Sequence, residues 1–222
     1  MALHSVRLSS CAASILWTLA LLAVFGACPL PAFAAAANPA ETFVQQNIDR
    51  GYVILNNASL PADQRHVQFR NFMLSVIEIK RIGMFTLGQY ANGASKADID
   101  AFTNAFTDYA VAVYESRLRK YKGLTLTVTG SIQRATDDVV VDADVVNPNA
   151  ASNAPPIKAA FRVRKSSDGK PVITDVQVEG IWLVLSQRSD FTGFLQQHSG
   201  KLSALTDKLK MQTEQVSADN PN

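Results

Sequence analysis

The chain has 222 residues and a formal net charge of +2, with 21 Lys and Arg residues against 19 Asp and Glu residues. This near balance provides no strongly basic surface, so we expect no nucleic-acid partner. The two cysteines, Cys11 and Cys28, both lie in the apolar N-terminal segment. If that segment is removed, the chain has no disulfide and no thiol chemistry.

Residues 1–34 have the pattern of a Sec-type signal peptide. Arg7 lies in a short basic start, residues 14–25 form an apolar run, and Ala32-Phe33-Ala34 provides a small-x-small cleavage site. The run is shorter than the about 20 residues that a membrane span needs. We therefore predict cleavage near Ala34 and a protein located in the periplasm.

A lipoprotein cut before Cys28 is the alternative to this cleavage, although Phe25-Gly26-Ala27 lacks the aliphatic start that such signals normally have. The chain that follows the signal has the length of one domain. We place this domain at residues 35–210. The polar residues 211–222 are predicted to form a disordered tail.

Helical spacing of apolar residues continues from residue 39 to about residue 121. It predicts helices at residues 39–57, from Pro61 to about 77, at 82–90 and at 95–121. The last is the clearest, because Ser95 with Asp98 three residues later is a capping signal and Gly123 suits the C-terminal end.

After Gly123 the apolar period changes from helical spacing to two residues. The alternation predicts four strands, at residues 124–129, 139–145, 157–164 and 172–185. Short turns between consecutive strands indicate an antiparallel meander. Helices at 187–197 and 201–211 follow. The predicted fold class is therefore α+β, with N-terminal helices, a four-stranded curved antiparallel sheet and C-terminal helices.

No common catalytic, metal-binding or nucleotide-binding motif is present, and we expect no cofactor, no metal site and no enzymatic activity. Ser186, Ser189, Asp190 and His198 are close in sequence, but Ser189 and Asp190 are adjacent on a predicted helix and therefore point in different directions. A nucleophilic site is thus not favoured.

The sequence does not decide the role of one basic cluster and of one further arginine. Arg117, Arg119, Lys120 and Lys122 lie at the end of the long predicted helix. They can complement the helix C-terminus, or they can meet an anionic head group or a membrane surface. Arg188 follows the apolar run 181–185 directly, so it can bind backbone carbonyls or stand at the mouth of a pocket.

Two sets of motifs stand in order along the chain. The helical half contains Leu87-Gly88-Gln89-Tyr90, Ala94-Ser95, Phe102 with Phe106, Tyr114 and Tyr121. The second half contains Asp175-Val-Gln-Val-Glu-Gly180 and Gln187-Arg-Ser-Asp-Phe191. Together these motifs, from about residue 41 to 210, resemble the MlaC, or toluene-tolerance, family of periplasmic lipid-binding proteins in identity and order.

This resemblance implies a carrier whose sheet and helices enclose a deep apolar cavity for acyl chains. The family hands lipid between an inner-membrane ABC transporter, or another membrane transporter, and an outer-membrane complex. The segment from Gln187 to Phe191 is closer to the hopanoid-associated HpnM branch, so the implied ligand is a phospholipid or a hopanoid. We expect a monomer.

Apolar periodicity and the resemblance together predict the residues that bind the lipid. Arg188 is the expected pocket rim, and Trp182 is expected to decide which lipid fits. The predicted lining residues are Met84, Phe102, Phe106, Tyr109, Val128, Val141, Phe161, Val178 and Trp182.

Two other functions stay possible on the sequence. A small exported α+β enzyme acting on an apolar substrate requires a polar group inside the cavity, for which Asp142, Asp144 and His66 are the candidates. An interaction module of the cell envelope has a solid core, and a structure without a cavity of at least about 300 Å³ would favour it.

Overall fold

The protein is described here by a computed structural model, which covers residues 38–120, 123, 125–147 and 154–219. The predicted signal peptide, its cleavage site and Tyr121 lie outside these residues. Within the covered ranges, no helix is both long and apolar enough to cross a membrane.

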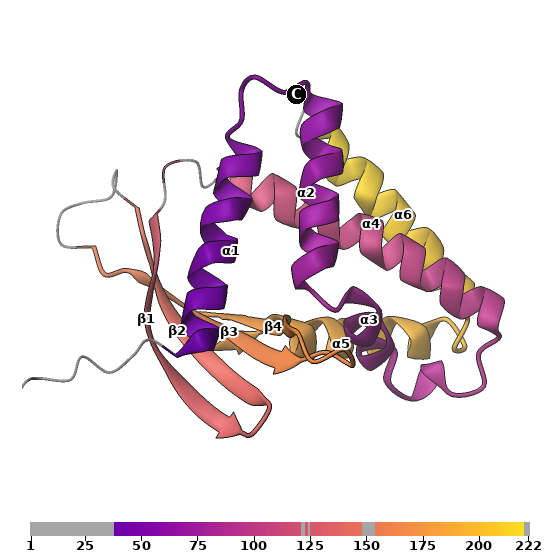
Figure 1. Cartoon of the computed structure of the whole chain (residues 1–222). Coiled ribbons are helices and arrows are strands. Elements are labelled where there is room, and N and C mark those ends of the chain that lie inside the picture. Colours follow the sequence, from indigo (N-terminus) through magenta and orange to yellow (C-terminus); the bar gives the residue numbers. More distant parts are fainter. Residues whose placement is uncertain (1–37, 121–122, 124, 148–153, 220–222) are drawn as a thin grey trace, which may run out of the picture. The chain divides into compact units, whose positions relative to one another are not determined.

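Helices form the first half of the described chain (Figure 1). They are α1 (Pro39–Leu55), α2 (Ala62–Val76), α3 (Ile79–Leu87), the 3-10 helix η1 (Gly88–Ala91) and α4 (Lys96–Lys120). The capping signal before α4 is confirmed, because Ser95 Oγ accepts a hydrogen bond of 3.1 Å from the backbone N–H of Asp98. Asn38 does the same for α1, accepting from Ala40 N–H at 2.9 Å.

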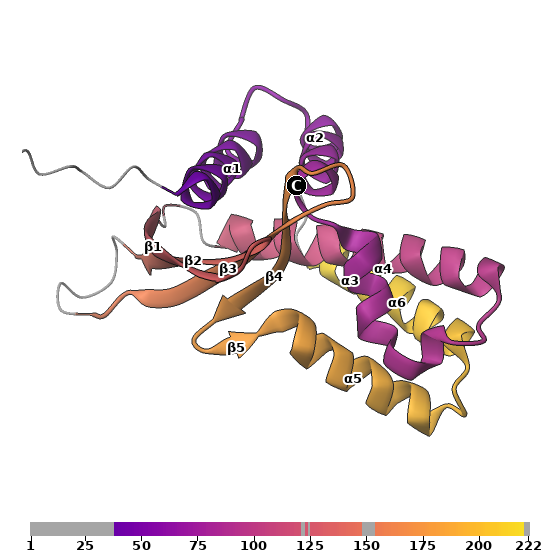
Figure 2. The same ribbon diagram turned by 60° about the horizontal axis from the view of Figure 1, so that its bottom comes forward.

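A single antiparallel sheet follows, with its strands in sequence order. The strands are β1 (Thr125–Ala135), β2 (Asp138–Val146), β3 (Ile157–Lys165), β4 (Pro171–Val178) and β5 (Ile181–Trp182). The α+β class is confirmed, while the described residues form five strands in place of the predicted four. α1 packs along the sheet through Val44, which is fully buried against Val141 and Val163 (Figure 2).

The prediction of one long strand from 172 to 185 is wrong. The chain turns back at Glu179 and Gly180, which have φ values of 52° and 83°. Two successive residues with positive φ form the tight turn that suits a two-residue β-hairpin, so Val178 pairs with Ile181. The remaining apolar residues, from Leu183 on, begin helix α5. The sequence-based prediction assigned them to a strand because a short apolar run does not distinguish a buried strand from a helix.

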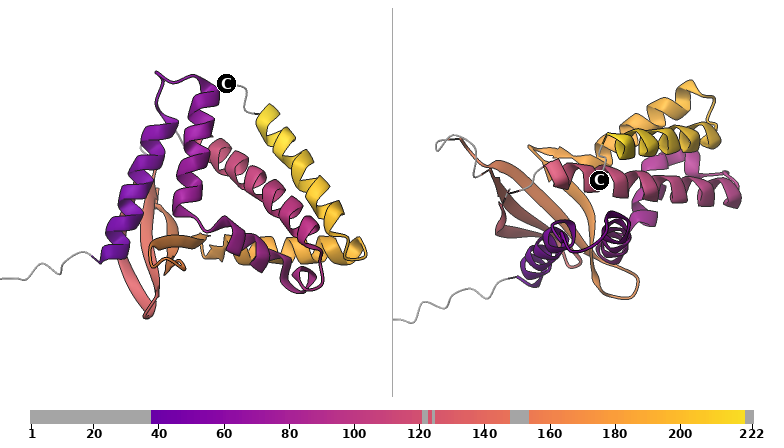
Figure 3. Two further views of the ribbon diagram at one scale, coloured as in Figure 1. Left: turned by 45° about the vertical axis from the view of Figure 1, so that its right-hand side comes forward. Right: turned by 90° about the horizontal axis from the view of Figure 1, so that it is seen from above.

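Two helices complete the chain, α5 (Leu183–Gln197) and α6 (Leu202–Ala218). α6 continues well past the predicted end at Met211, so residues up to Ala218 are helical rather than part of a disordered tail. Figure 3 shows α4 and α6 side by side. Between these helices and α5 lies the main core, where Phe102 packs edge-on against Phe191 with ring centroids 6.0 Å apart.

Candidate functional site

Two cavities lie between the helices and the sheet. The first, called here the sheet cavity, has a volume of about 540 Å³ and is bounded by α1, α2, the end of α4 and the sheet. Its apolar lining includes Val44, Ile48, Phe69, Phe72, Val76, Phe161, Val178 and Ile181. The second, called the helix cavity, has a volume of about 660 Å³ and is bounded by α2, α3, α4, α5, α6 and β4. Its lining includes Ile79, Phe106, Tyr109, Val113, Val184, Phe194 and Lys208.

The two cavities are adjacent and share one wall. This wall brings α2, α4, β4 and the start of α5 together, and it is mostly apolar. It consists of Met73, Ile77, Tyr114, Arg117, Ile173, Val176 and Leu183. Both volumes fall within the range of about 300–1,000 Å³ that small-molecule sites have.

The cavities differ in polarity. Among the described residues that line the sheet cavity, only Arg117 and Glu179 are charged. The helix cavity is lined by Asp175, Asp190 and Lys208 in addition to Arg117, and by several Ser and Gln residues. The sheet cavity is therefore suited to hydrocarbon, whereas the helix cavity can also hold polar groups.

Strand alternation accounts for the apolar wall. On β4, Val176 and Val178 project into the sheet cavity, while Gln177 between them does not line it. On β3, Ile157, Ala159 and Phe161 do the same. Residues two apart in a strand share one face, which explains why these side chains form one wall. Of the five, Phe161 and Val178 are among the predicted lining residues.

Asp175 connects the sheet to helix α5. Its Oδ1 accepts hydrogen bonds from the backbone N–H groups of Val176 and Val184, at 2.8 and 3.0 Å. Val184 lies in the first turn of α5, where Trp182 provides no side-chain cap, so Asp175 takes over that function from a neighbouring strand. Burial raises the pKa of this carboxyl, and the two backbone hydrogen bonds act in the opposite direction.

Four of the predicted lining residues line a cavity. Phe106 and Tyr109 lie on the helix cavity, and Phe161 and Val178 on the sheet cavity. Burial raises the pKa of the Tyr109 hydroxyl, while the positive charge of Arg117 lowers it.

The structure places three other predicted lining residues inside the packed core. Phe102 and Val141 are fully buried, each in a different apolar cluster, and Val128 packs against the second of these clusters. All three face inward, as their periodicity predicts. However, their neighbours there are side chains of the helices and the sheet, not a cavity, and periodicity does not separate these two cases.

Met84, Trp182 and Arg188 also lie away from both cavities. Met84 is 38% exposed on α3. Trp182 is half-buried and pairs with Gln177 in the hairpin, and its neighbours Ile181 and Leu183 line the sheet cavity in its place. The guanidinium of Arg188 lies over the ring of Phe85, 4.6 Å from its centroid, so it binds α5 to α3 and does not form a rim.

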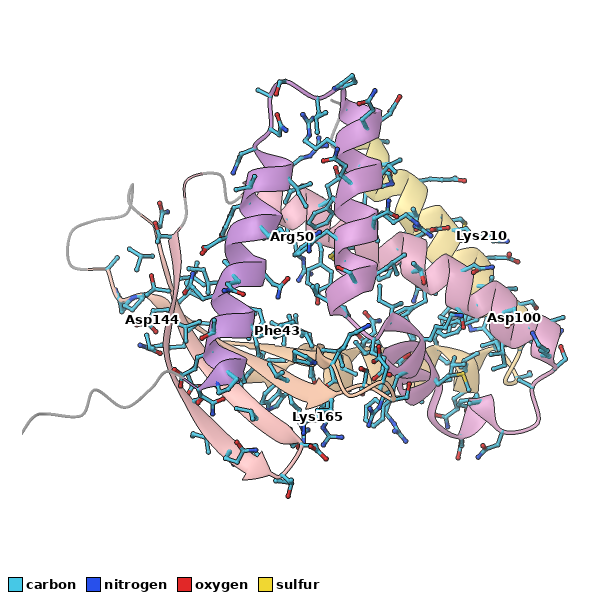
Figure 4. The ribbon with its side chains drawn as sticks, viewed as in Figure 1. Phe43, Arg50, Asp100, Asp144, Lys165 and Lys210 are labelled. Carbon is cyan, nitrogen blue, oxygen red and sulfur yellow. The ribbon has the colours of Figure 1, made fainter. Side chains whose placement is uncertain are left out.

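The candidates for an enzyme do not line either cavity. His66 Nδ1 lies 2.6 Å from a carboxylate oxygen of Glu115. Asp144, which is labelled on the strands in Figure 4, accepts a hydrogen bond from Lys158 Nζ at 2.7 Å. Asp142, on the same strand as Asp144, is absent from both linings.

The Ser, Asp and His residues of helix α5 and its C-terminal cap do not come together either. Ser186, Ser189 and Asp190 line the helix cavity, but His198 does not. Its ring stacks on Phe194 with centroids 3.8 Å apart, and its Nδ1 lies 2.8 Å from the Phe194 carbonyl oxygen. In the described part of the chain, no group of three or more His, Cys, Asp and Glu residues is placed to hold a metal ion.

Comparison with known proteins identifies the family. The family model of the MlaC protein matches residues 45–211, which include every residue of the shared wall. The chain belongs to the MlaC family.

A solved structure with the same fold is that of a phospholipid-binding protein from Ralstonia solanacearum, determined in complex with a phospholipid. It superposes with a TM-score of 0.68 at 21% sequence identity, over 80% of this chain and 98% of the other. At this identity the likeness shows a shared fold and nothing further.

Proposed function

We propose that the protein is a periplasmic lipid carrier. The observation that carries this proposal is the sheet cavity, about 540 Å³ in volume and lined by aliphatic and aromatic side chains with only Arg117 and Glu179 charged among the described residues. Such a lining offers no hydrogen bonds to trapped water along most of its surface, so hydrocarbon is its natural occupant. Membership in the MlaC family and the phospholipid held by the Ralstonia protein support this choice of ligand.

The free-energy cost of moving a lipid through water explains why such a carrier is needed. Each methylene exposed to water costs about 0.8 kcal/mol, so a chain of about 16 carbons faces a barrier on the order of 10 kcal/mol. A protein that encloses the chain removes most of this cost and needs no reactive group. This reasoning accounts for a cavity that combines apolar walls with few charges.

The finer parts of the proposal concern ligand and partners. We infer a phospholipid or a hopanoid as cargo, delivered between an inner-membrane transporter and an outer-membrane complex, with the signal peptide directing export. Trp182 lies outside the cavities, so cargo choice is assigned to residues of the shared wall, such as Met73, Tyr114 and Leu183.

The two other functions are less well supported. A cavity-free interaction module does not fit two cavities of this size. An enzyme requires a catalytic group at the cavity, and the three candidates His66, Asp142 and Asp144 are placed elsewhere.

Solvent extraction tests the proposal. The mature protein is purified from the periplasm of its host and extracted with organic solvent, and the lipids in the extract are identified and quantified by mass spectrometry. The delipidated protein is then offered phospholipid and hopanoid vesicles and extracted again. A stoichiometric lipid in either step supports a carrier. No lipid in the purified protein and no uptake from either vesicle would overturn it.

A further inference from the structure

Arg117 has a position that no other charged side chain of the described chain shares, since it lines both cavities. It belongs to one face of α4 together with Tyr109 and Val113, because residues four apart in a helix lie one above the other. The hydrocarbon-lined sheet cavity and the more polar helix cavity therefore meet at a cation.

Among the described residues, no ion-pair or hydrogen-bond partner of this cation is found. Arg117 forms no ion pair or hydrogen bond with any residue in the described ranges, whereas its neighbour Arg119 donates to the buried Glu115 at 2.7 Å. The charge of Arg117 reaches both phenol groups, since it lowers the pKa of the Tyr109 and Tyr114 hydroxyls against the raising effect of their burial. The guanidinium is thus close to the shared wall and free to bind a ligand.

The other charged groups on the cavities are less available or have the wrong sign for an anion. Asp175 is buried and engaged by two backbone N–H groups. Lys208 lies over the Phe194 ring, 4.3 Å from its centroid, and lines the helix cavity but not the shared wall. Glu179 and Asp190 are exposed carboxylates that do not pair with Arg117. Of the described residues on the shared wall, Arg117 is therefore the one cation available to an anionic group.

We propose that Arg117 binds the anionic group of an amphiphilic ligand whose hydrocarbon part fills the sheet cavity. The inference rests on the proposed lipid-carrier function and adds a ligand class, that of amphiphiles bearing a phosphate or a carboxylate. A guanidinium binds either group through two parallel N–H···O hydrogen bonds, whereas a neutral polar head gains no charge-assisted bond.

Binding of three single-chain lipids with the same 16-carbon chain tests this role. They are a lysophosphatidylglycerol, the free fatty acid and a neutral monoacylglycerol, each measured by displacement of a fluorescent fatty acid from the delipidated protein. Arg117→Gln removes the cation, and Arg117→Lys retains the charge without the planar fork. Arg134→Gln is the matched control, because Arg134 is exposed on β1 and forms no ion pair with another described residue.

The expected result is a loss of about tenfold in affinity for the phosphate lipid in Arg117→Gln, equivalent to about 1.4 kcal/mol. The monoacylglycerol should change less than twofold, Arg117→Lys should lose less than Arg117→Gln, and Arg134→Gln should match the wild type. A similar loss for the fatty acid assigns the site to anions in general, and its absence assigns it to phosphate.

An equal loss for charged and neutral lipids, or no loss for either anion, overturns the role of Arg117 and leaves the carrier function standing. If the wild-type protein binds none of the three lipids, the role of Arg117 is overturned as well, and the solvent extraction described above decides separately on the carrier function.

Discussion

Replacing Asp175 tests how the strand β4 holds the start of helix α5. Asp175→Ala removes the acceptor of the Val184 N–H, so a helix cap is lost and a half-buried donor has no partner. Loss of a cap costs about 1 kcal/mol, and an unsatisfied buried donor about 1–3 kcal/mol. We expect Asp175→Ala to lower the free energy of unfolding by about 2–3 kcal/mol in urea titration monitored by circular dichroism.

Asp175→Asn separates the acceptor from the charge. The amide oxygen has the same position as Oδ1 and can accept the same hydrogen bonds. Since the amide carries no charge, its burial does not incur the desolvation cost of a carboxylate. We therefore expect Asp175→Asn to cost less than about 1 kcal/mol at pH 7. Asp190→Ala is the control, since Asp190 lines the same helix cavity and makes no hydrogen bond or ion pair with a described residue.

The pH dependence gives a second readout for the same residue. Because burial raises the folded-state pKa of Asp175 above its ordinary value of 3.8, protonation stabilises the folded state more than the unfolded one. This contribution is fully present below the unfolded-state pKa and is lost as the pH rises through the folded-state pKa. The wild type should thus gain stability relative to Asp175→Asn as the pH falls toward 4. Equal destabilisation by Asn and Ala, or a gap between wild type and Asn that does not change with pH, would refute this explanation.

Two further predictions separate packed residues from exposed ones. Phe102→Ala should lower the free energy of unfolding by about 3–5 kcal/mol, because Phe102 is fully buried. Met84→Ala on the exposed side of α3 should change it by no more than about 0.5 kcal/mol. Comparable effects of the two substitutions in thermal unfolding would contradict the assignment of Phe102 to the core and Met84 to the surface. Gly180→Ala should cost about 1–2 kcal/mol from its φ of 83° alone, since an added Cβ would meet no atom within 4 Å there. A neutral Gly180→Ala would show that the hairpin does not need this backbone conformation.

The sequence predicted the helices and the inner face of the sheet well. Both depend on local signals, such as Ser95 and Asp98 at the start of α4 and the alternation of Ala159 and Phe161 on β3. The hairpin at Glu179 was missed, because an apolar run that continues across a turn hides the change from strand to helix. Gly180 was the available signal, since glycine is the residue that tolerates positive φ.

The candidate site was only partly predictable, for a physical reason. Periodicity tells which side chains face inward, but it does not tell whether another side chain or a cavity lies opposite. Phe106 and Phe102 are on the same helix with the same pattern, yet only Phe106 reaches a cavity. Arg117 belonged to a basic cluster whose role was open, and only the three-dimensional structure shows that it lies on both cavities.

The central claim is that the sheet cavity holds the lipid, and a cavity-filling variant tests it most directly. Ala159 is buried on β3 and lines this cavity, so Ala159→Trp fills part of its volume, while Ile132→Trp adds the same ring at a position that is 54% exposed on β1. Thermal unfolding first confirms that both variants fold. Native mass spectrometry of the three purified proteins should then show bound lipid in the wild type and in Ile132→Trp, and little or none in Ala159→Trp. Equal lipid occupancy in all three proteins would contradict the claim.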